Sequence, residues 1–109
     1  GQTEPDDPLV PGQGAPPSDS VPSAGKAIVY EVALSDSGSI IYVDDTGLRT
    51  AVGSPTKWSI TFTGVDNPLR ILVISAVGSA SCQIKVDGKV VAADSITGDS
   101  SRRTLSCRA

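Results

Sequence analysis

Two cysteines, Cys82 and Cys107, are the residues of this chain whose side chains could most directly do chemistry. Each occupies the apolar position of a two-residue alternation, Cys82 in phase with Ile84 and Cys107 in phase with Leu105. Alternate residues of a strand share a face, so both thiols should point into one core from separate strands. We favour a core disulfide, which would place the domain outside the cytosol. Two buried free thiols, or redox or metal chemistry, are the alternatives.

Histidine is absent from the chain, and the cysteines form no CxxC pair. Zinc sites usually combine closely spaced Cys and His ligands, so we expect neither a metal nor a cofactor. Without His there is no Ser-His-Asp or Cys-His pair, and the commonest general base is missing. We therefore expect a protein that is not an enzyme and has no catalytic residues.

Aspartates at two places could suggest a calcium site. Asp44 and Asp45 are adjacent, but neighbouring residues of a strand point to opposite faces, and an Asp before Thr-Gly is typical of a turn. Asp94 and Asp99 lie in a second polar segment. Turn and loop chemistry is the favoured interpretation of all four.

Arginine is concentrated near the C-terminus, at Arg102, Arg103 and Arg108. A planar guanidinium binds phosphate through two parallel hydrogen bonds, so an anionic partner such as a lipid headgroup could use these residues. The alternative is that their charge guards an exposed edge strand. The hypothesis of a partner or lipid contact therefore includes all three.

Composition divides the 109 residues into a leader and one small domain. Residues 1–25 hold six of the eight prolines and four of the twelve acidic residues, which indicates a disordered linker and spacer. Residues 26–109 then carry eight acids against nine bases, so no basic field suited to nucleic acid is expected. No apolar run of about 18 residues could span a membrane, and we expect the natural chain to carry a further N-terminal segment that anchors it.

Short alternating runs separated by Gly, Asp, Asn and Ser fill residues 26–109, which is typical of an antiparallel all-β domain. Asp87-Gly88 predicts a tight hairpin, and residues 69–77, apolar on both faces except at Arg70 and Ser75, predict a central strand partly covered outside the core. Trp58 is expected inside with Ile60 and Phe62. We predict an immunoglobulin-like β-sandwich of about seven strands with almost no helix. The runs cover residues 28–34, 39–43, 48–52, 57–63, 69–77, 81–86, 89–93 and 103–107.

Several segments resemble the soluble domain of the mycobacterial MmpS family. They are residues 29–32 (VYEV), residues 41–44 (IYVD) followed by Gly47, a proline ahead of Trp58, residues 82–91 (CQIKVDGKVV) and the closing Cys107. The resemblance begins near Lys26 and covers the whole predicted domain. Its most specific part is residues 82–91 together with Cys107.

This resemblance implies a Cys82–Cys107 disulfide and an extracytoplasmic β-sandwich anchored by an N-terminal membrane helix. It also implies an accessory role beside MmpL transporters of the RND superfamily, which export lipids, glycolipids and siderophores. We accordingly expect an MmpL-type partner and lipid or siderophore cargo in the periplasm or cell envelope. The alternative is a free-standing secreted or lipid-anchored module that binds lipid or glycan in the envelope.

Overall fold

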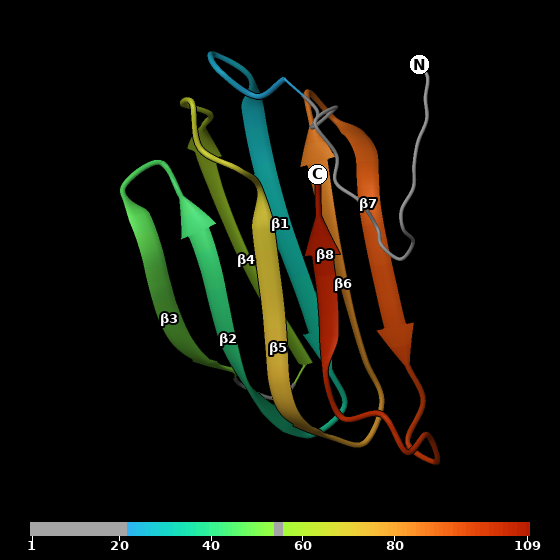
Figure 1. The fold of residues 1–109 in the computed structure, drawn as a ribbon. Helices are drawn as coiled ribbons and strands as arrows, with labels where there is room; N and C mark the ends of the chain where they lie inside the picture. The colour runs from blue at the N-terminus through green and yellow to red at the C-terminus, as the bar shows by residue number, and fades with distance from the viewer. Residues whose placement is uncertain (1–21, 54–55) are drawn as a thin grey trace, which may run out of the picture.

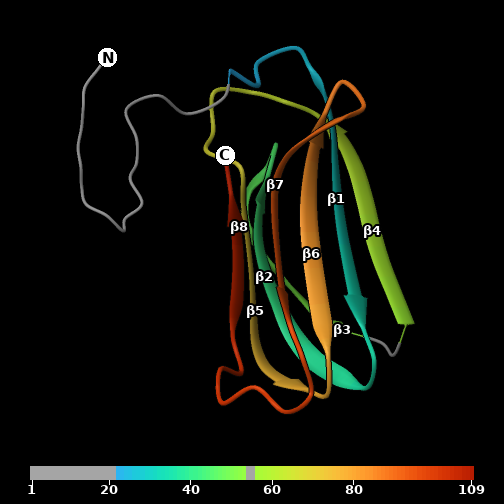
Figure 2. The ribbon, with the colours of Figure 1, turned by 90° about the vertical axis from the view of Figure 1, so that its right-hand side faces the viewer.

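Two four-stranded antiparallel sheets pack face to face in the computed structural model, which describes residues 22–53 and 56–109. The β1 sheet has the order β4-β1-β6-β7 and the β2 sheet has the order β3-β2-β5-β8. Figures 1 and 2 show the two layers, with the β2 sheet in front in Figure 1. The predicted antiparallel all-β sandwich is confirmed, with eight strands where about seven were expected. The strands are β1 (Ala27–Leu34), β2 (Ser37–Asp44), β3 (Gly47–Gly53), β4 (Thr56–Thr63), β5 (Arg70–Val77), β6 (Ala80–Val86), β7 (Lys89–Ile96) and β8 (Leu105–Arg108).

Turn chemistry closes two hairpins where the sequence predicts it. Asp87 and Gly88 have φ values of 50° and 84°, the pair of positive angles that a tight turn between β6 and β7 requires. Between β2 and β3, the Asp44 carboxylate accepts hydrogen bonds from the Thr46 backbone N–H at 2.8 Å and from the Thr46 hydroxyl at 2.7 Å. Gly47 then adopts a φ of 114°. Asp44 therefore serves the turn, as predicted.

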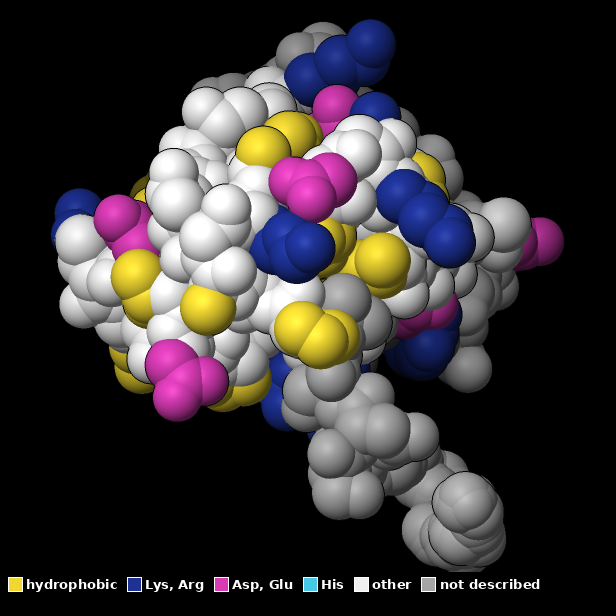
Figure 3. Space-filling view, turned by 90° about the horizontal axis from the view of Figure 1, so that it is seen from above, with side chains coloured by type: hydrophobic (Ala, Val, Ile, Leu, Met, Phe, Trp, Pro, Cys, Tyr) yellow, Lys and Arg dark blue, Asp and Glu magenta, His cyan; other side chains and the backbone are white. Residues whose placement is uncertain are grey.

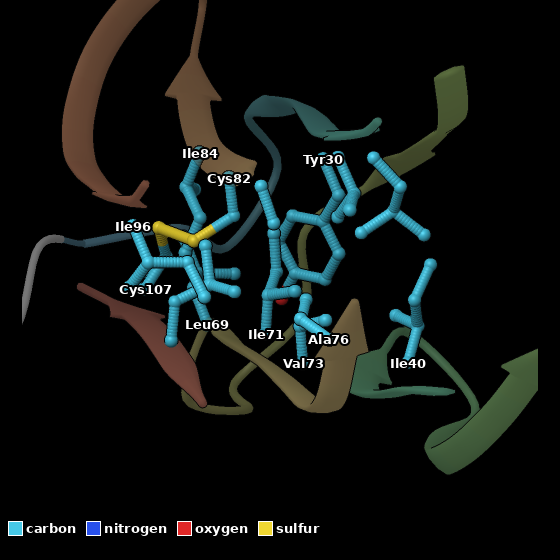
Figure 4. Packing of buried hydrophobic residues seen from close by; sticks show 14 of the residues in the cluster. Tyr30, Ile40, Leu69, Ile71, Val73, Ala76, Cys82, Ile84, Ile96 and Cys107 are labelled. Carbon is cyan, nitrogen blue, oxygen red and sulfur yellow. A yellow bond between two sulfur atoms is a disulfide. The ribbon is translucent and has the colours of Figure 1, made fainter. Parts of the chain in front are cut away.

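The core lies between the inner faces of the two sheets (Figure 4). Cys82 on β6 and Cys107 on β8 are both buried there and form a disulfide with a Cα–Cα distance of 6.3 Å. The predicted core disulfide is confirmed, and it joins one sheet to the other. Because disulfides persist in oxidising compartments, the bond is consistent with an extracytoplasmic domain.

Edge strand β4 contributes three half-buried apolar side chains, two of them aromatic, to one side of this core. Trp58, Ile60 and Phe62 all pack against the buried cluster, so the predicted inward face is confirmed. The Trp58 ring lies 4.9 Å from that of Tyr42, and the Phe62 ring meets Tyr30 edge-on at 5.1 Å. These side chains are half-buried rather than fully buried because β4 has a neighbouring strand on one side only.

Ser23, three residues before the predicted start of the domain, packs against the loop between β4 and β5. Ser23 is 7% exposed, and its hydroxyl donates a hydrogen bond to the Val65 carbonyl at 3.0 Å. Backbone hydrogen bonds of 2.8 Å run from Gly25 to Gly64 and from Gly64 to Lys26. A Cβ on Gly64 would lie 1.9 Å from the Ser23 carbonyl oxygen, so only glycine permits this approach. Residues 1–21 of the predicted linker lie outside the described residues.

Candidate functional site

The outer face of the β1 sheet is polar. Glu31 on β1 accepts a hydrogen bond from the Gln83 side chain on β6, and its carboxylate lies 3.4 Å from the Lys85 ammonium. The hydrogen bond from Gln83 is the main cause that lowers the pKa of Glu31; slight burial opposes it and Lys85 adds to it. Glu31 is therefore ionised and already paired.

A shallow hollow of about 660 Å³ lies over this polar sheet, lined by residues of all four strands. Short side chains make it shallow and wide, because they leave room above the backbone between the longer Glu31, Gln83 and Lys57. The hollow could accept a polar ligand with hydroxyl groups. The short residues are Ala33, Ser59, Ser81, Ala93 and Ser95.

The outer face of the β2 sheet carries many apolar side chains, in contrast to that of the β1 sheet, with the polar Ser39, Thr50 and Ser106 among them. Strand pairing places Ile41 between Thr50 and Leu72, and Val43 between Leu48 and Arg70. Leu72 is 37% exposed and Leu48 73% exposed. We call this surface the apolar face. Its residues are Ile41, Val43, Leu48, Val52, Leu72 and Ile74.

Strand β5 occupies the position expected for residues 69–77, between β2 and β8. The expected partial cover outside the core is only partly present, because Ile74 is half-buried while Leu72 is exposed. The apolar face was not singled out from the sequence, although a signal existed. Residues 40–43 are apolar at every position, so β2 is apolar on both of its faces.

Two arginines meet at one end of the apolar face. Arg70 on β5 and Arg108 on β8 are direct cross-strand partners. Arg70 donates hydrogen bonds to the carbonyls of Leu69 at 2.8 Å and Ala109 at 3.2 Å. Burial, followed by the charge of Arg108, lowers the pKa of Arg70. Like charges directly opposite each other destabilise a strand pair, and a bound anionic group would relieve that repulsion.

The structure does not bring Arg102, Arg103 and Arg108 together on one surface. Arg102 and Arg103 precede β8 whereas Arg108 ends it, which separates them by roughly 16 Å along an extended strand. Arg103 donates to the carbonyls of Ala76, Gly78 and Thr97 at 3.1, 2.9 and 2.6 Å, and so holds neighbouring loops together. Of the three predicted contact residues, only Arg108 borders the apolar face.

Arg102 belongs to a small network that covers the free edge of β8. Its guanidinium donates to the Asp94 carboxylate and to the Ser95 carbonyl, both at 2.9 Å. The second carboxylate oxygen of Asp94 accepts from the Ser106 backbone N–H at 3.0 Å. Asp94 lies on β7 and not in a loop as expected, because β7 extends to Ile96. Its carboxylate thereby satisfies a backbone donor of β8 across the open side of the sandwich.

Replacing this carboxylate by Asp94→Asn should destabilise the domain by about 1 kcal/mol at pH 7, because an amide makes weaker hydrogen bonds than a carboxylate. Burial raises the pKa of Asp94, but hydrogen bonds from Ser106 and Arg102 outweigh burial and lower it overall. The stabilisation therefore exists above the unfolded carboxyl pKa of about 3.9 and is lost as the pH falls through the lower folded pKa.

Urea unfolding at pH 7 and pH 2.5 would measure this difference. Asp45→Asn is the control, since Asp45 is an exposed carboxylate of equal charge. A difference between Asp94→Asn and the native protein that is as large at pH 2.5 as at pH 7 would contradict the assigned role.

The remaining acidic candidates also make local contacts. Asp99 accepts a hydrogen bond from the Thr97 hydroxyl at 2.6 Å, and Asp44 caps the turn described above. Within residues 22–53 and 56–109, no group of three or more His, Cys, Asp or Glu side chains converges as a set of metal ligands.

Comparison with known proteins does not assign this domain to a family. Neither the family models nor the curated proteins contain a match to the chain. In the part of the chain that the structure describes, no helix is long and apolar enough to cross a membrane. The candidate functional site is thus the apolar face with the Arg70–Arg108 pair at its end, and it rests on geometry alone.

Proposed function

We propose that this protein is a non-enzymatic extracytoplasmic accessory domain of an MmpL-type export system, which binds the transporter or its amphiphilic cargo through the apolar face. The observation behind this proposal is the contrast between the two outer sheet faces. Antiparallel sheets commonly turn a polar face to water, as the β1 sheet does. A large contiguous apolar surface on a monomer usually marks a binding site.

Three further features support the proposal. The disulfide suits an oxidising compartment outside the cytosol. The segments that resemble MmpS proteins, residues 29–32, 41–44 and 82–91, lie within four strands and one hairpin turn of the two sheets. Arg70 and Arg108 add positive charge where an apolar partner with an anionic group could place that group. We further propose that a segment beyond the described domain anchors the protein to the membrane.

An acidic substitution on the apolar face tests the proposal. The host strain with a clean deletion is complemented with the native protein, Leu72→Asp, Leu48→Asp or the control Thr61→Asp. Thr61 is exposed on the outer face of the other sheet, so this control adds the same charge to a strand. We expect both apolar-face variants to lose most transporter co-purification and most export of the lipid or siderophore, while Thr61→Asp retains both.

Thermal unfolding of each purified variant shows whether it remains folded, and Leu48→Asp alters a side chain that is already largely exposed. Normal export from the deletion strain would count against an accessory role. Full function of both apolar-face variants would instead show that another surface is used.

The polar hollow of the β1 sheet favours a second candidate function. A free-standing module of the cell envelope could bind glycan hydroxyl groups between Glu31, Gln83 and the short side chains. Binding of envelope glycans by the isolated domain, abolished by Ser81→Trp in the hollow and unaffected by Leu72→Asp, would favour this alternative.

A further inference from the structure

Among the described edge strands, β3 exposes the most large apolar side chains. The remaining described edges are β4, β7 and β8. β7 contains a register shift opposite residues 84 and 85. β8 is only four residues long, and the Asp94 carboxylate accepts a hydrogen bond from one of its backbone N–H groups. The outward side chains of β4 are polar. Bulges, short length and charge are the usual protections of a sheet edge.

β3, by contrast, is seven residues long and has one charged residue, Arg49. Its side chains at Leu48 and Val52 are 73% and 87% exposed and point to the same face as Thr50. Long edges with exposed apolar side chains pair readily with another strand. This edge therefore fits an extended strand as its partner.

The residues of β3 are complementary to a second β3 in one antiparallel register. A two-fold axis at Thr50 places each Thr50 opposite its copy, Leu48 opposite Val52, and Arg49 opposite Ala51. Threonine pairs and apolar pairs are favourable across strands, and no like charges meet.

Neighbouring registers are less favourable. An axis at Arg49 places two arginines opposite each other, which is repulsive. An axis at Ala51 leaves Leu48 without a partner inside the strand. A shift of the β3–β3 register by one residue is also unfavourable, because it places the inner face of one β2 sheet beside the outer face of the other.

We propose that two copies of this protein pair through β3 in the Thr50-centred register. The two β2 sheets then form one continuous eight-stranded sheet, and the two apolar faces join into a single surface with an arginine pair toward each far edge. This dimer is independent of the proposed transport function. Stable interfaces bury about 800 Å² per partner, more than one strand pair usually provides, so we expect a readily dissociating dimer.

Cysteine crosslinking tests both the dimer and its register. The only two cysteines of the chain are joined in the disulfide, so an introduced cysteine is the sole free thiol. Residues directly opposite on antiparallel strands have Cα atoms about 4.5 to 5.5 Å apart, within the range of a disulfide, while positions two residues out of register are beyond it. Thr50→Cys should therefore crosslink on mild oxidation at least tenfold more than Arg49→Cys or the β4 control Thr61→Cys.

Light scattering over a concentration series gives an independent measurement. The native protein should shift toward twice the monomer mass as its concentration rises, while Val52→Lys, altered at a largely exposed position, should remain monomeric. Equal crosslinking of all three cysteine variants, or a native protein that stays monomeric together with uncrosslinked Thr50→Cys, would overturn the proposal. Crosslinking of Thr50→Cys to the transporter instead of to a second copy would assign β3 to that partner and also overturn it.

Discussion

Removal of the disulfide by Cys82→Ala together with Cys107→Ala is expected to lower the free energy of unfolding by about 3 to 4 kcal/mol. The two residues are 25 positions apart, and the bond restricts the unfolded chain by closing that loop. For a domain of this size the loss corresponds to a fall in Tm of roughly 15 to 25 °C. Alanine is used because both sites are buried, where a serine hydroxyl would add its own desolvation cost.

Guanidinium unfolding of the native and double-variant proteins, each with and without a reductant, measures this effect. The reductant should bring the native protein close to the stability of the variant and leave the variant unchanged. Two free thiols in the native protein, found by mass spectrometry under non-reducing conditions, would contradict the disulfide and the compartment inferred from it.

Tyr30→Phe should destabilise the domain by about 1 to 3 kcal/mol, although it removes a single oxygen atom. The Tyr30 side chain crosses the core from β1, and its hydroxyl donates to the Val43 carbonyl and accepts from the Arg70 N–H at 3.0 Å. Val43 and Arg70 face each other on β2 and β5, so Phe would leave a carbonyl and an N–H without this partner. The tyrosine thus ties one sheet to the end of a strand pair in the other.

Ionisation of the Tyr30 hydroxyl should lower the stability of the domain at alkaline pH. Burial raises the pKa of Tyr30 to about 12, against an opposing hydrogen bond from Arg70. Because the folded pKa lies above the unfolded value of about 10, the stabilisation is complete below pH 10 and is lost as the pH rises toward 12. Because one pKa unit corresponds to about 1.4 kcal/mol, the loss in the free energy of unfolding should approach about 2 to 3 kcal/mol.

Unfolding measured from pH 8 to pH 12 tests the assignment, with Tyr42→Phe as a control at a half-buried ring. Stability should fall with pH in the native protein and in Tyr42→Phe, and fall much less in Tyr30→Phe. Parallel pH profiles of all three proteins would show that Tyr30 does not cause the alkaline transition.

Local pattern and turn chemistry predict most of the sandwich. Every strand starts within two residues of a predicted run, because alternation marks the buried face and the Asp-Gly and Asp-Asp-Thr-Gly segments mark two of the turns. The position of Ser23 was not predictable in this way. The residues around Ser23 have the composition of a linker. Ser23 is buried because Gly64, 41 residues away, has no side chain and lets the two backbone segments come into contact.

The candidate site was harder to predict than the fold. Arg102 and Arg108 are close in sequence but point to different parts of the molecule, while Arg70 and Arg108 are far apart in sequence and directly opposite in space. Strands β2 and β5 are apolar on both faces, which predicts that their outer side chains have a covering partner. Sequence alone does not tell whether that partner is the same chain or another molecule.

The disulfide also determines what a protease could remove from this domain. Together with the intervening backbone it forms a covalent ring that contains all of β7 and the exposed loop around Arg102. A single cut between Cys82 and Cys107 opens the ring but leaves both fragments attached through sulfur. A nicked molecule outside the cytosol can therefore keep its strands in place.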